Sequence, residues 1–327
     1  MSATTPFLPS PDQLRRILAA AGIDEPIVTC TALEGGYSNA VLDLDDRYIL
    51  RLSNLPGTAQ RFGRERAALE RTAELPGVPR LLGAGRLGAY GAWRYLLLEK
   101  LPGENLFRAW LDATAEERIR YAQELAGWMR ALHGIPMERY CCGYHQTALR
   151  ARPEGTSWLA GHDAYVRRLL RLVRAQRRDA GLAGLIDAAE AYYAAHREAL
   201  GYQVGPRLLH GDLQLYNVIV DRGHLTGVVD WEWAHGGEPD FDLADLARWA
   251  LYPVDVAEEA LEPRVAPEDF ATLMPALLDA YPEVAGIPRL CERLTIYQLE
   301  YDLHKLAQAP RSPRLPARRL RGWLRGE

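Results

Sequence analysis

The sequence predicts an α+β protein with two lobes: a small, β-rich N-terminal lobe at residues 1–100 and a larger, mostly helical C-terminal lobe at residues 101–327. Short runs of β-branched and apolar residues, separated by turn residues, occupy most of the first part. Longer stretches with helix-forming composition and capping signals occupy most of the second part, and the proline-containing run Leu101–Gly103 marks the joint. A chain of 327 residues is long for one hydrophobic core and sufficient for two.

The N-terminal lobe is predicted to contain two helices and a sheet. Ser10 can cap the first helix, and Gln13 completes a capping box with it. Pro11 suits the first turn, and Gly22 ends the helix. The second helix is predicted at residues 59–73, where arginine, glutamate and alanine predominate. Strands are predicted at residues 27–33, 40–44, 48–52, 80–82 and 94–99.

The C-terminal lobe is predicted to be helical around one β segment. Thr114 and Glu117 form a capping-box pattern before the first of its helices. The predicted helices lie at residues 115–133, 163–178, 182–199, 243–250, 267–280 and 288–307, and the β segment lies at residues 207–229. The arginine-rich residues 311–327 form either a loose tail or a packed one.

Composition and charge exclude several classes of protein. The formal net charge of −4 argues against nucleic acid as the main partner, because binding the phosphate backbone needs a basic surface. Basic clusters at residues 167–178 and 311–325 are interpreted as solvated surface. The four cysteines form no CxxC pair, the N-terminus lacks the pattern of a signal peptide, and no apolar stretch approaches the roughly 20 residues that span a bilayer. We therefore expect a cytoplasmic protein with reduced thiols and no membrane partner.

The strongest functional signal is HGDLQLYN at residues 210–217, followed by VVDWEWA at residues 228–234. Asp212 offers a carboxylate that can accept the proton of an attacking hydroxyl group. Asn217 and Asp230 offer hard oxygen atoms, the ligands that Mg²⁺ prefers. Phosphoryl transfer depends mainly on positioning and charge neutralisation, so these few groups suit it. The alternative is that the HGD run forms a polar turn between buried strands.

These two segments resemble the catalytic loop and the metal-binding segment of the aminoglycoside phosphotransferase and choline kinase superfamily, which has a protein-kinase-like fold. The resemblance implies a small-molecule kinase with ATP or GTP as phosphate donor, Mg²⁺ as cofactor and a small hydroxylated acceptor. It implies that Asp212 is the catalytic base, and that Asn217 and Asp230 are catalytic residues that bind the magnesium.

The N-terminal lobe resembles the nucleotide site of the same family in two places. The first is a glycine-rich loop, in which backbone amides can approach phosphates and polar side chains add donors. Its candidate nucleotide-binding residues are Gly35, Gly36, Ser38 and Asn39. The second is the hinge between the lobes, where backbone groups from Glu99 to Leu101 are expected to bind the adenine edge.

Arg51 occupies the strand position at which protein kinases carry a lysine for the α- and β-phosphates. Lys100 and Lys305 are the only lysines in the chain, and they belong to the joint and to the last predicted helix. Arginine offers planar, bidentate contacts where lysine offers a compact charge. The resemblance implies that Glu65 is the partner of Arg51, and Glu70 is the competing candidate.

Asp242 matches a family aspartate that braces the catalytic loop. Asp240 is the alternative brace, and either residue can instead cap the helix predicted from residue 243.

Four residues are candidates for binding the acceptor. In aminoglycoside-modifying relatives, acidic side chains near the C-terminal end of the chain bind the cationic antibiotic, and Glu300 and Asp302 lie in a similar place. Trp231 and Glu232 follow the metal aspartate and can line the same pocket. These residues favour a cationic acceptor, of the aminoglycoside or amino-alcohol type. The alternative is that Glu300 and Asp302 are solvated helix residues.

Other functions are favoured by fewer observations. A nucleotide-binding pseudokinase or regulatory module is favoured by Arg51 in place of lysine and opposed by the presence of all three catalytic residues. A kinase of proteins is opposed by the short stretch between Asp230 and the next helix, which leaves little room for an activation loop. The run Gly83–Gly88 fits the dinucleotide pattern GxGxxG, but a predicted strand follows it where that pattern requires a helix, so a hairpin is predicted.

Overall fold

The computed structural model describes residues 8–33, 40–87, 93–141, 157–176, 180–308 and 314–326. The chain divides into two units. The first unit comprises Met1–Glu104, Val218–Arg222 and Thr226–Ala234, and the second comprises Asn105–Asn217, Gly223–Leu225 and His235–Glu327. The predicted division between residues 100 and 101 therefore differs in one respect. Two short segments after the 210–217 loop, Val218–Arg222 and Thr226–Ala234, belong to the first unit.

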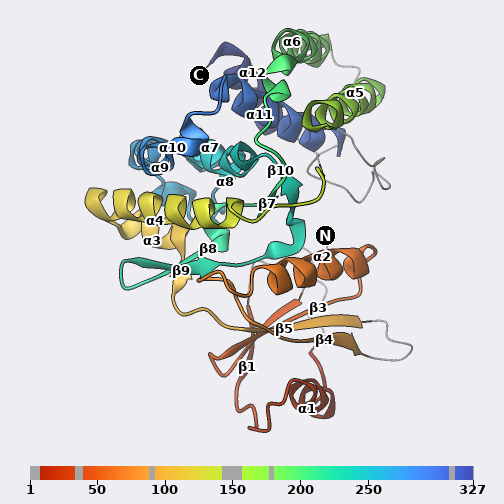
Figure 1. The fold of residues 1–327 in the computed structure, drawn as a ribbon, viewed down its shortest axis with the longest axis vertical. Helices are drawn as coiled ribbons and strands as arrows, with labels where there is room; N and C mark the ends of the chain where they lie inside the picture. Colours follow the sequence, from red (N-terminus) through yellow and green to blue (C-terminus); the bar gives the residue numbers. More distant parts are fainter. Residues whose placement is uncertain are drawn as a thin grey trace. The chain divides into compact units, whose positions relative to one another are not determined.

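An antiparallel five-stranded sheet forms the centre of the first unit, in the order β1-β2-β3-β5-β4. Helices α1 (Pro11–Ala20) and α2 (Thr58–Arg71) lie on opposite faces of the sheet (Figure 1). The strands are β1 (Cys30–Leu33), β2 (Ala40–Leu44), β3 (Tyr48–Ser53), β4 (Leu81–Leu87) and β5 (Trp93–Glu99). The predicted capping box of Ser10 and Gln13 is present at the start of α1.

Alternation along the strands gives the two faces different roles. Leu50 and Leu52 of β3 belong to an apolar core with Ile17 and Leu18 of α1. Arg51 lies between these two leucines, so its side chain leaves the opposite face, which α2 covers. The period of the strand thus places one buried arginine beneath α2.

The segment Thr226–Ala234 contacts the rest of the first unit through a close approach of two backbones. The Val228 amide donates a hydrogen bond of 2.8 Å to the Gly77 carbonyl oxygen. A Cβ atom on Gly227 would overlap the backbone of Gly77, so this approach needs a glycine. Strands β8 (Val218–Asp221) and β9 (His224–Val228) lie with β6 (Glu104–Asn105) in the sheet order β6-β8-β9. The one-turn 3₁₀ helix η5 (Trp231–Trp233) follows and packs against α2.

The second unit is mainly helical, with one two-stranded antiparallel sheet of β7 (Arg207–Leu209) and β10 (His235–Gly237). Helices α5, α6, α11 and α12 form one packed group, and α4, α7 and α9 form another (Figure 1). The α-helices are α3 (Leu106–Asp112), α4 (Ala115–His133), α5 (Trp158–Gln176), α6 (Ala180–His196), α7 (Leu243–Leu251), α8 (Pro253–Val256), α9 (Leu273–Ala280), α10 (Pro282–Ala285), α11 (Leu290–Ala307) and α12 (Arg314–Arg325). The 3₁₀ helices are η3 (Arg197–Gly201), η4 (Leu215–Asn217), η6 (Pro239–Asp242), η7 (Glu262–Arg264) and η8 (Pro267–Phe270).

Most sequence predictions of secondary structure are confirmed, and some need correction. Helix α4 has the predicted bounds and the predicted capping box of Thr114 and Glu117. The seven-residue helix α3, capped by Asn105, was not predicted. Of the two alternatives left open for the C-terminal residues, the packed one is confirmed, since residues 314–325 form helix α12. The predicted helix at residues 267–280 is instead two pieces, η8 and α9.

Two exclusions based on sequence can also be compared with the structure. Gly83 and Gly85 lie within β4, which pairs with β5, as the hairpin prediction requires, whereas Gly88 lies outside the described residues. In the described part of the chain, no helix combines the length and the apolar character needed to cross a membrane.

Candidate active site

The side chain of Asp242 binds the backbone of the loop at residues 210–217. Its carboxylate accepts hydrogen bonds of 2.8 Å from each of the backbone amides of His210 and Gly211. It also contacts Nε2 of His133 at 3.1 Å, and His133 in turn contacts the Tyr281 hydroxyl at 3.1 Å. Gly211 has a φ of 79°, a left-handed conformation that suits glycine and turns the chain toward Asp212. Asp242 is therefore the brace of the loop.

Burial alone would raise the pKa of Asp242, but the hydrogen bond and charge of His133, with His210 and the Gly211 amide, outweigh it. The net effect is a lowered pKa, so the carboxylate is ionised when it holds the loop. The alternative brace, Asp240, instead binds Arg293.

We expect Asp242→Asn to lower the free energy of unfolding at pH 7 by about 1.5–3 kcal/mol, because an amide group turns an N–H toward one of the two backbone donors. Since the pKa of Asp242 is lowered in the folded state, its stabilising effect is complete above the ordinary aspartate pKa of about 3.9 and is lost as the pH falls through the folded value. The difference from wild type should therefore shrink below pH 4 in urea unfolding curves. Asp279→Asn, on the exposed surface of α9, is the control and should change stability by no more than about 0.5 kcal/mol. A deficit of the variant that persists unchanged into acid contradicts the assignment.

Within the same loop, Asp212 and Asn217 are joined directly. The amide nitrogen of Asn217 donates to the Asp212 carbonyl oxygen at 2.8 Å and lies 3.3 Å from the Asp212 carboxylate. The Gln214 side chain donates to the same carboxylate at 3.2 Å. Asp212 is half-buried and Asn217 is buried. The contacts orient the carboxylate and commit the Asn217 nitrogen, so its amide oxygen is the atom left to bind a cation.

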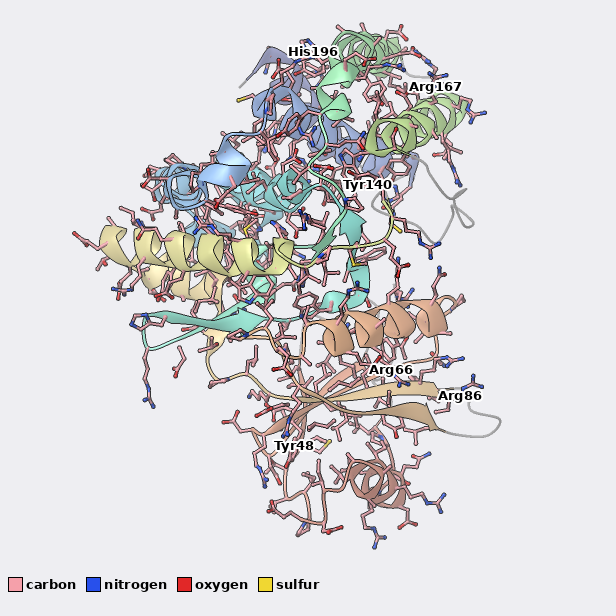
Figure 2. All side chains as sticks on the ribbon, in the orientation of Figure 1. Tyr48, Arg66, Arg86, Tyr140, Arg167 and His196 are labelled. Atoms are coloured by element: carbon pink, nitrogen blue, oxygen red, sulfur yellow. The ribbon has the colours of Figure 1, made fainter. Side chains whose placement is uncertain are left out.

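In the first unit, Arg51 joins Asp230 to helix α2. Nη1 of Arg51 bonds Glu65 Oε1, and Nη2 lies 2.9 Å from Asp230 Oδ1. Both Arg51 and Glu65 are buried, whereas 37% of the Asp230 side chain is exposed. Glu70, the competing candidate, pairs instead with Arg66, which Figure 2 labels on α2. The structure thus brings together three of the residues expected to act on the nucleotide.

The electrostatics of this cluster follow from burial and from its excess of carboxylates. Burial raises the pKa of the Glu65 carboxyl, and the charges of Asp230 and Glu232 raise it further against the opposing effect of Arg51. Burial alone would lower the pKa of Arg51, but the surrounding carboxylates outweigh it and raise that pKa. The guanidinium therefore stays charged, and its carboxylate neighbours compete for it.

Two of the four expected acceptor-binding residues lie inside the first unit. Trp231 is fully buried and donates its indole N–H to the Val228 carbonyl oxygen at 3.0 Å. Glu232 is buried near two arginines, with its Oε2 at 3.5 Å from Arg51 Nη2 and 3.7 Å from Arg61 Nε. The prediction that these side chains line an acceptor pocket is therefore corrected, since both serve the interior of their own unit.

The other two expected acceptor residues are also internal. Glu300 and Asp302 are both 0% exposed. Glu300 bonds His162 at 2.5 Å, and Asp302 accepts hydrogen bonds from Arg319 and Trp323 of α12. Both the substrate-binding interpretation and the solvated alternative are corrected, because α5 and α12 cover this part of α11.

The remaining nucleotide candidates are only partly described. The loop residues Gly35, Gly36, Ser38 and Asn39 lie outside the described residues. Glu99 ends β5, and its backbone amide donates to the Arg80 carbonyl oxygen at 2.9 Å. Leu101 follows two residues later and is half-buried. The assignment of Glu99 and Leu101 to the adenine edge stays a prediction.

Comparisons with known proteins bear on the family and on the fold of the chain. The model of the phosphotransferase enzyme family (APH) matches residues 29–280 of the chain. Among curated proteins, none matches the chain.

Solved structures of aminoglycoside phosphotransferases resemble it over almost their whole length. A ternary complex of a thermostable mutant of APH(4)-Ia with AMP-PNP and hygromycin B is 18% identical, with a TM-score of 0.65 and coverage of 95% of this chain and 98% of that one. The GDP complex of wild-type aminoglycoside 2'-phosphotransferase-IIIa is 17% identical, with a TM-score of 0.68 and coverage of 97% and 99%. The GDP and kanamycin complex of APH(2")-IIia is 16% identical, with a TM-score of 0.64 and coverage of 96% and 99%. These likenesses show that the chain has their protein-kinase-like fold.

Proposed function

The chain belongs to the phosphotransferase enzyme family, and from this premise we propose that it transfers the γ-phosphate of ATP or GTP to a hydroxyl group of a small molecule. The observation that carries the proposal is the loop in which Asp242 holds two successive backbone amides and Asn217 holds Asp212. This arrangement fixes one half-exposed carboxylate on a braced turn, as a base for an acceptor hydroxyl requires.

Asp212 accepts the hydroxyl proton of the acceptor as the oxygen attacks phosphorus. Its carboxylate already receives hydrogen bonds from Gln214 and Asn217, which fix its orientation. Fixing the base in advance removes part of the entropic cost of bringing the reacting groups together.

Arg51 binds the phosphates of the donor in this proposal. Its guanidinium is charged, buried at the β3–α2 interface and oriented by Glu65. Planar guanidinium groups suit phosphate oxygens because they offer two parallel donors.

Magnesium fits the residues present. Within the described residues, no group of three or more His, Cys, Asp or Glu side chains is placed to hold a metal, and a magnesium ion takes few protein ligands and keeps the others for phosphate and water. We assign Asp230, whose Oδ2 is not the oxygen bound to Arg51, and Asn217, through its amide oxygen, as its ligands. When bound, the ion neutralises phosphate charge.

We extend the proposal to a cationic, hydroxylated acceptor of the aminoglycoside or amino-alcohol type. Two of the structural relatives are complexes with hygromycin B or kanamycin. The support is the likeness alone, since the four candidate residues for this role proved to be internal.

A second candidate function, a pseudokinase that binds nucleotide without turnover, is favoured by one contact. The Asp230 carboxylate is bonded to Arg51, and a residue locked in this ion pair has a reduced ability to bind magnesium. Nucleotide binding that does not depend on magnesium, with no phosphate transfer to any hydroxylated acceptor, would support this function.

The first test is thermal stabilisation by ATP and by GTP, each with and without Mg²⁺. A nucleotide at 100 times its Kd should stabilise the wild type by about 2.7 kcal/mol, and Asp230→Ala should lose the magnesium-dependent part. Asp221→Ala is a matched control, since 38% of the Asp221 side chain is exposed compared with 37% for Asp230. Equal stabilisation of Asp230→Ala and wild type would remove Asp230 from the metal site. A positive result identifies the donor and justifies a screen of aminoglycosides and amino alcohols as acceptors.

A further inference from the structure

Glu232 shares one nitrogen atom of Arg51 with Asp230. The one-turn helix η5 begins after Asp230, which has a left-handed φ of 68°, and it brings both carboxylates to the same guanidinium. Nη2 of Arg51 lies 2.9 Å from Asp230 Oδ1 and 3.5 Å from Glu232 Oε2. The side chain of Glu232 is 8% exposed, whereas that of Asp230 is 37% exposed. Nη2 of Arg51 therefore has two carboxylates near it. The partly exposed Asp230 is at the shorter distance, and the buried Glu232 is at the longer one.

A second arginine and a phenylalanine lie beside the contact between Glu232 and Arg51. Arg61 of α2 approaches its Oε2 from Nε at 3.7 Å. The guanidinium of Arg51 lies over the ring of Phe62 at 5.9 Å, and its Nη1 is fixed by Glu65. This geometry uses the two outer nitrogens of a planar fork, which lysine cannot supply from a single ammonium group.

We propose that Glu232 is a positioning residue for Arg51: it retains the Nη2 end of the guanidinium when Asp230 binds a cation. This inference rests on the proposed function, in which Asp230 is a ligand of nucleotide-bound magnesium. A cation on Oδ2 of the exposed Asp230 carboxylate draws negative charge away from Oδ1, and this weakens the hydrogen bond between Oδ1 and Arg51. Glu232 is then the acceptor already within reach of Nη2, so Arg51 remains oriented by Glu65 and Glu232.

The consequence is a link between Glu232 and the affinity for magnesium. Without the Glu232 carboxylate, a cation on Asp230 weakens the main hydrogen bond of Arg51 Nη2 and leaves a buried donor poorly bonded. Binding of the cation then carries an energetic penalty that the wild type avoids.

The experiment is a Mg²⁺ titration at a fixed, saturating concentration of the nucleotide that stabilises the wild type. The melting temperature is measured at each Mg²⁺ concentration. Glu232→Gln should raise the Mg²⁺ concentration at half-maximal stabilisation about tenfold, the typical effect of losing one charge-assisted hydrogen bond. Glu232→Asp, which keeps the carboxylate on a shorter side chain, should give a smaller shift. Glu70→Gln makes the same chemical change on the exposed surface of α2, where Glu70 pairs with Arg66, and should leave the titration midpoint unchanged.

The double variant distinguishes positioning from a structural role. Arg51→Lys should itself raise the midpoint, and adding Glu232→Gln to it should cause no further shift, because Glu232 acts through the guanidinium. The inference is overturned if Glu232→Gln has the wild-type midpoint, if the two shifts multiply, or if Glu232→Gln lowers only the melting temperature without ligand. Wild-type protein that no nucleotide stabilises would refute the proposed function, and this inference with it. Normal wild-type stabilisation together with an unshifted Glu232→Gln refutes this inference alone.

Discussion

Replacement of Asp212 by asparagine should reduce kcat for phosphate transfer by a factor of about 10² to 10⁴, the usual contribution of a general base. Asparagine is nearly the same size and can keep a contact with Gln214, but its amide cannot accept the proton of the acceptor hydroxyl. The loop should keep its shape, because the bond from Asn217 goes to the backbone carbonyl of Asp212 at 2.8 Å. The measurement is steady-state transfer with the donor and the acceptor found in the screen.

The expected signature is a fall in kcat at an unchanged KM for nucleotide. Asp212→Asn should also show the wild-type magnesium-dependent thermal stabilisation by nucleotide, since the base contacts the acceptor and not the donor. Asp221→Asn is a control for the loss of an acidic side chain near the loop in sequence, and it should turn over as the wild type does. Full turnover by Asp212→Asn would show that another group accepts the proton.

Local signals in the sequence account for the parts of the fold that could be predicted. The capping boxes of α1 and α4 use residues three positions apart, so the pattern is visible without any tertiary information. The strand period places Arg51 on the face of β3 opposite to Leu50 and Leu52, and Glu65 of α2 faces it there. The brace by Asp242 followed from its resemblance to a family position, and its contacts agree with that reading.

The errors arise where burial depends on segments far apart in sequence. Glu300 and Asp302 have no local feature that distinguishes a buried acid from an exposed one. They are buried because Arg319 and Trp323 of α12 bond Asp302 and because His162 of α5 bonds Glu300. The arginine content of α12 suggested a solvated tail, yet Arg319 is 5% exposed and supplies an internal charge. An acid and an arginine predicted separately as surface residues thus become interior by pairing.

The same cause explains the boundary between the units. Gly77 and Gly227 are 150 positions apart in the sequence, and either glycine alone is an ordinary turn signal. Their backbones meet so closely that a side chain on Gly227 would collide with Gly77. This contact, the packing of η5 against α2 and the ion pair of Arg51 with Asp230 are among the contacts that Thr226–Ala234 makes with the rest of the first unit.

The largest effect on stability is expected at the buried ion pair of Arg293 and Asp240. Both side chains are 0% exposed. Nε and Nη2 of Arg293 bond the two Asp240 oxygens at 2.6 and 2.8 Å, and Nη1 bonds the carbonyl oxygens of Ala199 and Tyr202 at 2.8 and 2.9 Å. The pair therefore connects α11 to η6 and to the end of η3. The Asp240 carboxylate also accepts a hydrogen bond of 3.0 Å from the Tyr297 hydroxyl group.

Arg293→Met should lower the free energy of unfolding by about 3–5 kcal/mol, because it leaves a buried carboxylate without its cation. Arg174→Met is the matched control: Arg174 also pairs with two carboxylate oxygens, of Asp187 and Glu190, but 41% of its side chain is exposed. Removing that surface pair should cost at most about 1 kcal/mol. The measurement for both variants is urea unfolding followed by tryptophan fluorescence.

A second variant separates the loss of the charge pair from the loss of packing. Asp240→Asn added to Arg293→Met removes the stranded charge, so the double variant should recover part of the stability that Arg293→Met loses. Recovery means that the cost of Arg293→Met comes from an unpaired charge in the interior. If Arg293→Met and Arg174→Met lower the free energy of unfolding equally, burial does not increase the contribution of this ion pair to stability.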